Sequence, residues 1–443
     1  MWDLLIKNAT VVSSESEFRA DVAIEAGKIA KVAPSLSEAA KETIDATGLT
    51  LIPGVIDTQV HLREPGLTHK EDLETGGRSA VLGGVTTFLE MPNTTPPTTT
   101  VESIAVKVDL ASGRSYANFG FFMGATDSNL EELKLASEVP GCCGIKIFLG
   151  SSTGDLLLYD AKILRQIFHE TKGVIAIHSE DEERLIARKH IRDAATHPRE
   201  HPVWRDVHSA LDSTVRVVEL ARAENRSLHI LHITTKEEIE FLSKNKDLMT
   251  VEVTPQHLTL FAPDCYEKLG TLAQMNPPIR SKDHQDGLWE GLKSGVVDVI
   301  GSDHAPHTLE EKQRAYPNTP SGMPGLQTTL PLMLDHVSKG RLSLTKMVEL
   351  LCYRPSTLYN LKSKGEVKEG KDADLVLVDL SKKHVLKNNE MASKCGWTPF
   401  DGKEVTGMPV KTIVGGHVVM SDGKILGSPH GKPIASLQER LKS

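Results

Sequence analysis

Side chains able to do acid–base or metal chemistry recur at or near the ends of short apolar runs in the middle of this chain. These residues are His61, Arg63, Asn93, Lys146, His178, His232, Asp303 and His307. The three imidazoles at 61, 178 and 232, the amine and the carboxylate could together hold two divalent cations, and such nitrogen and oxygen donors suit zinc. Two cations about 3.5 to 4 Å apart can hold a bridging hydroxide and polarise a carbonyl. The set therefore predicts metal-assisted hydrolysis, although one histidine alone on a strand is more often a packing residue.

Lys146 and Gln59 need specific explanations within this pattern. Lys146 lies in the apolar run 144–149, where a buried ammonium is costly. Either it pairs with a nearby acid, or its amine has added carbon dioxide to give a carbamate that bridges two cations. Gln59 alternates with His61, so both point to one face of a strand. A second imidazole there would complete half of a metal site, whereas an amide binds metal weakly.

Eight apolar runs, most of them followed by a turn and a helical stretch, must position these residues. The runs span 54–61, 85–93, 117–126, 144–150, 174–180, 228–234, 250–257 and 296–307. Continuous apolar strands that alternate with helices pair in parallel, and eight such units predict an α/β fold of the (β/α)8 TIM barrel type. The carboxyl ends of the strands then converge on one mouth, so residues far apart in the sequence would line one pocket.

Helices are expected at 70–82 and 130–137, among others. Asp212, Ser213 and Thr214 form the expected N-cap region of the helix before strand six.

Both ends of the chain differ from the middle and are rich in short strands. Residues 4–12 and 21–32 near the start, and 374–379 and 411–420 near the end, have β-rich composition, with Gly27 marking a turn. We therefore expect a small β-sandwich domain formed from both termini, residues 1–52 and 362–443. The barrel would occupy residues 53–361.

Composition excludes several classes of protein. The 443 residues carry a net charge of −8 and are 39% hydrophobic, which is ordinary for a globular protein with a substantial core. We find no basic block that would indicate a nucleic-acid partner, and no apolar run near the roughly 20 residues that would span a membrane. The start lacks the layout of a signal peptide, so a cytoplasmic location is expected.

Seven motifs make the chain resemble the amidohydrolase superfamily and, within it, the dihydroorotase family of cyclic amidohydrolases. They are 60–66 (VHLREPG), 90–94 (EMPNT), 144–146 (GIK), 177–180 (IHSE), 231–234 (LHIT), 276–280 (NPPIR) and 302–307 (SDHAPH). They occur in the family's order and cover essentially the whole predicted barrel. The resemblance implies reversible zinc-dependent hydrolysis of L-dihydroorotate to N-carbamoyl-L-aspartate, a step of pyrimidine biosynthesis, with one or two zinc ions per chain.

The resemblance also implies a role for each matching residue. The positions of the metal ligands are matched by His61, Lys146, His178, His232 and Asp303. Asp303 would also be the general base and acid. The positions that hold the substrate's carboxylate are matched by Arg63, Asn93 and His307, and a position that contacts the ring amide is matched by Asn276. A planar guanidinium beside an amide and an imidazole is a suitable fork for a small carboxylate. A turn residue at 93 and a loop cap at 307 are the simpler alternatives.

The family usually has His-x-His where this chain has Gln59 and His61, and three outcomes are open. The Gln59 oxygen ligates weakly, or the first metal has fewer ligands or is lost, or the protein is inactive. We expect activity because the other site residues remain. An inactive chain would instead be a scaffold that supports a partner such as aspartate transcarbamoylase.

Allantoinase and dihydropyrimidinase are the related alternatives, and Arg63 disfavours both. Allantoinases resemble this motif but carry Asn at that position, and dihydropyrimidinase substrates lack the carboxylate that Arg63 would hold. A homodimer is expected from the family alone. The stretch 307–325, rich in proline and glycine, is interpreted either as a mobile lid or as a plain surface loop.

Overall fold

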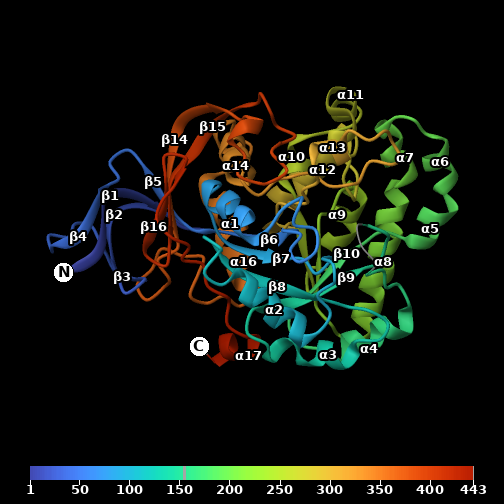
Figure 1. The fold of residues 1–443 in the computed structure, drawn as a ribbon, viewed down its shortest axis with the longest axis horizontal. Coiled ribbons are helices and arrows are strands. Elements are labelled where there is room, and N and C mark those ends of the chain that lie inside the picture. The colour runs from blue at the N-terminus through green and yellow to red at the C-terminus, as the bar shows by residue number, and fades with distance from the viewer. Residues whose placement is uncertain (153–155, 443) are drawn as a thin grey trace.

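The protein consists of a barrel and a smaller sheet built from the two ends of the chain (Figure 1). A computed structural model describes residues 1–152 and 156–442. In Figure 1 the blue N-terminal strands lie beside the red C-terminal strands, and the barrel with its helices fills the rest of the molecule.

Eight parallel strands form the barrel, and each coincides with one of the eight predicted runs, although the fourth and seventh strands begin two residues and one residue before their runs. They are β6 (Val55–Val60), β7 (Val85–Glu90), β8 (Asn118–Gly124), β9 (Cys142–Phe148), β10 (Ile175–His178), β11 (Leu228–Ile230), β12 (Met249–Val253) and β13 (Val299–Ile300). Neighbours in sequence are neighbours in the sheet. The first and last strands meet where Val60 bridges His304, and His61 N donates to His304 O at 2.7 Å. The predicted (β/α)8 barrel is confirmed.

Helices follow the strands and cover the outside of the barrel. The main ones are α1 (Leu73–Leu82), α2 (Val101–Ala111), α3 (Leu130–Leu135), α4 (Ala161–Glu170), α8 (Val207–Ala223), α9 (Lys236–Ser243), α12 (Lys282–Lys293) and α14 (Thr329–Ser338). Shorter helices lie in the connections: α5 (Glu182–Ala187), α6 (Lys189–Ala194), α7 (His201–Trp204), α10 (Pro255–Thr259), α11 (Asp264–Leu269), α13 (Leu309–Lys312), α15 (Leu344–Val348) and α16 (Arg354–Leu358).

The predicted N-cap of the helix before the sixth strand was wrong. Helix α8 (Val207–Ala223) begins five residues before Asp212, with Asp206 as its N-cap. Asp206 accepts from the backbone of Ser209, as a capping carboxylate should. Ser213 and Thr214 lie inside the helix and are buried, and Thr214 Oγ1 donates to Glu238 at 2.9 Å. A hydrogen bond to another helix, and not a capping role, explains why Thr214 has a polar side chain at this buried position.

The small domain is a nine-stranded, mostly antiparallel sheet from both ends of the chain, as predicted. Its strands are β1 (Trp2–Val12), β2 (Glu17–Glu25), β3 (Lys28–Ala33), β4 (Ala40–Asp45), β5 (Thr50–Pro53), β14 (Leu375–Val385), β15 (Glu404–Val414), β16 (His417–Ser421) and β17 (Lys424–Ile425). Ile29 and Ile413 lie far apart in the strand order but share one hydrophobic core, so the sheet folds over on itself.

Two segments of the predicted small domain contact the barrel, and the boundary drawn at residue 362 stays a prediction. Ile434 N donates to Phe119 O at 2.9 Å, and the following helix α17 (Leu437–Lys442) lies beneath the barrel beside α3 (Figure 1). Ile434 packs in one cluster with Phe122 and Tyr359, so the chain's end closes the N-terminal end of the barrel. At the opposite end, Trp397 Nε1 donates to His307 O at 2.8 Å.

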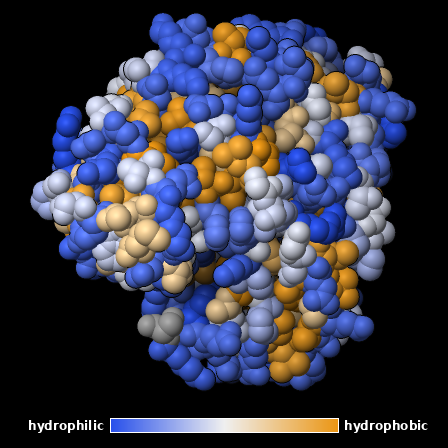
Figure 2. Space-filling model, turned by 60° about the vertical axis from the view of Figure 1, so that its left-hand side comes forward, coloured by the Kyte–Doolittle hydropathy of each residue, from blue (hydrophilic) through white to orange (hydrophobic). Residues whose placement is uncertain are grey.

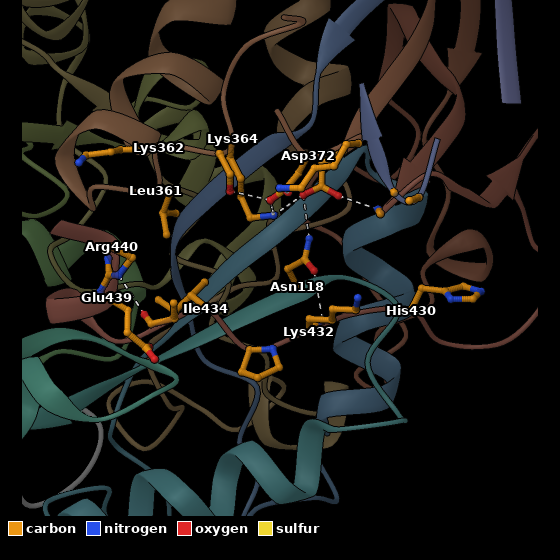
Figure 3. A pocket seen from close by; sticks show the side chains of 18 of the residues that line it. Asn118, Leu361, Lys362, Lys364, Asp372, His430, Lys432, Ile434, Glu439 and Arg440 are labelled. Carbon is orange, nitrogen blue, oxygen red and sulfur yellow. Dashed lines mark hydrogen bonds and ion pairs between the residues drawn. The ribbon is translucent and has the colours of Figure 1, made fainter. Parts of the chain in front are cut away.

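A buried network joins the small sheet to the barrel floor (Figure 3). Asp374 accepts from Asn118 of β8 at 2.9 Å and forms an ion pair with Lys364. Lys364 also pairs with Asp372 at 3.1 Å. These residues line a cavity of about 650 Å³ between the two bodies. Ion pairs and hydrogen bonds between polar side chains therefore make up much of this junction.

Within residues 1–152 and 156–442, no helix is both long and apolar enough to cross a bilayer. The face in Figure 2 is mostly hydrophilic, with hydrophobic side chains gathered in a few groups.

Removing the Asp374 carboxylate should destabilise the protein. Asp374→Ala would leave Lys364 with Asp372 as its acidic partner. It would also deprive the Gly415 N–H of its acceptor and leave the Asn118 amide with the Thr86 carbonyl alone. We expect the free energy of unfolding to fall by about 3 kcal/mol, the usual cost of breaking a buried ion pair. Urea unfolding followed by circular dichroism measures this. Glu38→Ala, which removes the exposed partner of Lys31, is the control, and equal midpoints for both variants would contradict the prediction.

Candidate active site

The predicted site residues converge at the C-terminal end of the barrel strands around one small cavity. The cavity is lined by Gln59, His61, Arg63, Asn93, Phe148, Ser152, His178, His232, Asn276, Asp303, Ala305, Ser321 and Gly322. Its volume of about 20 Å³ is room for about one water molecule. Two predicted residues, Lys146 and His307, lie in the layer behind this wall. The structure thus brings together residues from six of the predicted runs, with Arg63 and Asn276 from the connections between them.

Strand ends and unusual backbone conformations aim these side chains inward. Lys146 lies within β9, and His178 is the last residue of β10. Arg63, His232 and Asp303 follow their strands with φ of 65°, 35° and 43°. Such left-handed conformations are uncommon for residues with a side chain and cluster at functional sites, where the surrounding packing holds them.

His61 and Asp303 form the first pair of the site. His61 Nδ1 donates to Asn93 Oδ1 at 2.6 Å, so its Nε2 has no proton in the neutral ring. That Nε2 lies 3.2 Å from Asp303 Oδ1. Gln59 Nε2 donates to the same carboxylate oxygen at 3.1 Å. Two electron-pair donors as close as His61 Nε2 and Asp303 Oδ1 require a cation or a proton between them.

His178 and His232 form the second pair. His178 Nε2 donates to Glu180 at 2.9 Å, which leaves its Nδ1 to accept from His232 Nε2 at 3.0 Å. The unprotonated His232 Nδ1 is buried and has no hydrogen-bond partner within the described chain. Burial lowers the pKa of both histidines, so both rings are neutral at pH 7. Neutral imidazole is the form that binds metal.

Lys146 is buried behind these pairs and has no polar partner. Its Nζ makes no hydrogen bond and no ion pair within residues 1–152 and 156–442, and lies 4.5 Å from the centre of the Phe148 ring. The predicted alternative of an ion pair with a nearby acid is therefore wrong for this arrangement. Burial lowers the pKa of Lys146 to about 7, although Asp303 opposes the shift. A large share of the amine is neutral at pH 7, the form that can add carbon dioxide.

The donor set fits a divalent cation. Lys146 Nζ, His232 Nδ1 and Gln59 Oε1 are buried and have no hydrogen-bond partner among the described residues, and bound cations or their waters commonly satisfy such atoms. The close approach of His61 Nε2 to Asp303 points the same way. Nowhere in the described ranges do three His, Cys, Asp or Glu side chains form a ready cation site, because the ligand atoms pair with one another. A carbamate on Lys146 would supply the missing shared donor.

Asp303 has the properties of a proton carrier near neutral pH. Burial, reinforced by the negative charge of Glu252, raises the pKa of Asp303 to about 7. A carboxylate with this pKa can accept and return a proton at pH 7.

The three residues of the predicted carboxylate clamp do not all lie on the cavity wall. Asn93 holds His61 through its Oδ1, so its carbonyl is already used. His307 does not line the cavity; its Nε2 donates to Ser321 O at 3.1 Å and lies 3.4 Å from Arg63 Nη2. Lys70 Nζ donates to the other ring nitrogen at 3.2 Å. His307 therefore lies behind Arg63 and not on the cavity wall.

Arg63 remains as the cation of the cavity wall. Its side chain is 1% exposed, and it forms no ion pair within the described part of the chain. Its Nε donates to Pro306 O at 3.1 Å. Burial lowers the pKa of Arg63 to about 10, so it stays charged at neutral pH. A buried guanidinium without an anion indicates that a ligand supplies one.

Three buried acids near the metal-site residues escaped the sequence analysis. Glu180 is fully buried, accepts from His178, and pairs with Arg205 at 2.6 Å. Although burial opposes it, Arg205 and then His178 hold the pKa of Glu180 well below its usual range. Glu252 accepts from Thr58, and burial raises the pKa of Asp57 to about 7. Glu180 lies two residues after His178, the spacing of side chains on one face of an extended strand, which could have identified it.

Segment 307–325 covers the cavity. Ser321 and Gly322 form part of its wall, and Gly322 N donates to Gln274 O at 2.9 Å. Lys312 Nζ donates to the same carbonyl at 2.9 Å and to Pro320 O at 2.8 Å. The segment therefore lies beside the site as predicted, hydrogen-bonded to the loop that carries Asn276. Its movement as a lid stays a prediction.

Comparison with known proteins relates the whole chain to cyclic-amide hydrolases. The model of the amidohydrolase family matches residues 50–419. A dihydroorotase from Pyrococcus abyssi is 35% identical over 416 residues, covering 93% of this chain and 94% of that protein. An L-hydantoinase from Paenarthrobacter aurescens is 33% identical over 448 residues, covering 96% of each. Among solved structures, the L-hydantoinase (dihydropyrimidinase) from Arthrobacter aurescens has a TM-score of 0.94 at 31% identity, covering 98% of this chain and 100% of that one.

Neutralising Glu180 should weaken metal binding. Glu180→Gln keeps the shape but removes the charge that fixes the His178 ring, so we expect zinc affinity to fall by about 10- to 100-fold. Competition with a chelating dye measures it. Glu183→Gln, at an exposed position on the following helix, is the control and should bind zinc like the wild type. Unchanged zinc affinity in Glu180→Gln would show that His178 needs no support.

Proposed function

The chain belongs to the amidohydrolase family, and from this premise we propose that it is a dihydroorotase, which interconverts L-dihydroorotate and N-carbamoyl-L-aspartate. Its relatives are named for reactions on cyclic amides, so hydrolysis of a cyclic amide is the general activity. Dihydroorotate is the specific substrate that the cavity wall favours.

The observation that supports this choice is the buried charge of Arg63. Dihydroorotate carries a carboxylate on its ring, whereas hydantoin and dihydropyrimidine rings need not carry any. A guanidinium that is 1% exposed and has no ion pair in the described chain gains most from an anionic ligand. The Asn93 side chain, anchored on His61, stands beside it on the same wall. Together they would orient the ring with its amide toward Asp303.

The chain's own residues can move the proton that ring opening requires. Water adds to the ring amide carbon, the carbon–nitrogen bond breaks, and one proton passes from the water to the leaving nitrogen. Asp303 can carry that proton, because burial gives it a pKa of about 7. The Gln59 amide donates to Asp303 Oδ1 and so helps to fix the orientation of its carboxylate.

A metal centre would complete the site. His61, Lys146 as a carbamate, His178, His232 and Asp303 would hold it. When bound, zinc would lower the pKa of water and polarise the ring carbonyl. The reverse reaction, ring closure, would use the same residues with the proton moving in the opposite direction.

A hydantoinase is the second candidate, because the high structural similarity to an L-hydantoinase favours it. The two activities differ in the role of Arg63, because a hydantoin ring has no carboxylate for its guanidinium to bind. A catalytically inactive scaffold for aspartate transcarbamoylase, and a homodimeric assembly, remain proposals that solution experiments address separately.

Substrate choice can be tested with Arg63→Met. The zinc-supplemented wild type should hydrolyse L-dihydroorotate, followed by loss of ultraviolet absorbance, and a chelator should abolish the reaction. Loss of a charge-assisted bidentate contact should raise the KM for dihydroorotate about a hundredfold. Any slow turnover of hydantoin should be little affected, which makes it the matched control. Faster hydrolysis of hydantoin than of dihydroorotate by the wild type would favour the hydantoinase, and no turnover of either would favour the scaffold.

The number of bound metals depends on Gln59. Its amide is neutral and donates to Asp303 Oδ1, so the His61 half of the site has one imidazole fewer than a His-x-His pair would supply. We expect about one tightly bound zinc per chain in the wild type and about two in Gln59→His. Elemental analysis after gel filtration measures the ratio. Gln59→Met, which adds no ligand of similar strength, should not exceed the wild type; equal ratios in the wild type and Gln59→His would refute the idea.

A further inference from the structure

We propose that His201 is a positioning residue that fixes the side-chain amide of Asn276, so that its NH2 group donates to the substrate ring. Tyr316, on the segment that covers the cavity, in turn selects the His201 tautomer. This inference rests on the proposed function for the identity of the ring, and on geometry alone for the hydrogen-bond chain.

Three side chains form a continuous hydrogen-bonded chain from the covering segment to the cavity wall. His201 Nε2 lies 2.8 Å from Asn276 Oδ1. His201 Nδ1 lies 3.4 Å from the Tyr316 hydroxyl. An amide oxygen can only accept, so the proton of His201 is on Nε2. Nδ1 then carries a lone pair, and the Tyr316 hydroxyl donates to it.

Burial keeps His201 in this singly protonated form. Its side chain is 1% exposed, and burial, followed by the charge of Arg205, lowers the pKa of His201 to about 3. The ring therefore carries one proton at any pH at which the enzyme would work. Trp204 and Tyr316 contact the ring in edge-to-face geometry, with ring centres 5.7 and 5.9 Å away. These contacts restrict rotation of the imidazole.

Fixing the oxygen of Asn276 determines which end of its side-chain amide faces the cavity. Asn276 lines the cavity, and within the described ranges its Nδ2 has no hydrogen-bond partner. With Oδ1 held by His201, the amide presents two N–H donors on its other side. A ring carbonyl can accept from such a donor. Without His201 the amide could rotate and place its oxygen against that carbonyl, which would be repulsive.

The covering segment and Asn276 are linked through neighbouring backbone. Gln274 O accepts from Gly322 N and from Lys312 Nζ, and Gln274 Nε2 donates to Thr319 O at 3.1 Å. These contacts hold the segment against the loop two residues before Asn276. When the segment packs against this loop, it therefore places the Tyr316 hydroxyl beside His201 and fixes the orientation of the Asn276 amide.

Kinetics of three variants test the positioning role. His201→Phe keeps a ring of similar shape but removes the donor, so the KM for dihydroorotate should rise about tenfold, the effect of losing one hydrogen bond, while kcat changes less than twofold. His201→Gln can still donate to Asn276 and should recover most of that loss. A fold defect alone would lower kcat per chain without moving KM. His190→Phe, at an exposed histidine nearby, is the control. An unchanged KM in His201→Phe overturns the proposal.

A spectroscopic measurement tests the same chain without turnover. In protein labelled with ¹⁵N-histidine, the His201 signals are those lost in His201→Phe. We expect the shifts of an Nε2–H tautomer in the wild type, and a mixture of tautomers in Tyr316→Phe. An Nδ1–H tautomer in the wild type would overturn the inference even in an active enzyme. The expected tautomer in a protein that turns over no dihydroorotate would overturn the proposed substrate and leave the hydrogen-bond chain standing.

Discussion

The exclusion of water from ionisable side chains at the barrel mouth is the constraint on which the rest of this site depends. Lys146 and Asp303 would be charged in water at pH 7, yet burial brings the pKa of each to about 7. The same desolvation keeps His178 and His232 neutral and able to bind metal. A single physical effect therefore prepares an amine that can be modified, a carboxyl that can exchange protons, and imidazoles with lone pairs available.

Hydrogen bonds from a second layer decide which atom of each side chain faces the cavity. Asn93 accepts a hydrogen bond from the N–H of His61, and Glu180 accepts one from the N–H of His178. His201 plays the corresponding part for Asn276. In each case the outer partner binds one of the two polar atoms of the imidazole or amide, so that the other polar atom faces the cavity. Such support is what holds a catalytic geometry within the small tolerances that chemistry requires.

The small domain contributes to the site although most of it lies elsewhere. Trp397, which follows β14 in the chain, donates to the backbone of His307 behind Arg63. Ser393 donates to Glu71, whose carboxylate lies 3.4 Å from His304 Nε2. The polar junction around Asp374 anchors the sheet at the other end of the barrel (Figure 3). Segments from the C-terminal part of the chain thus support both ends of the barrel, which accounts for contacts that a simple division into two domains would miss.

The sequence by itself determined the eight strands, the barrel and the set of reactive residues. Periodicity and strand ends are local properties, so they can be recognised from the order of residues along the chain. It also predicted the two-ended sheet. It could not place His307 behind Arg63 or show that Asn93 holds His61. Those facts depend on distances between side chains from different strands and loops. Only tertiary packing sets such distances, because the partners are tens to hundreds of residues apart and no local pattern records which atoms will meet.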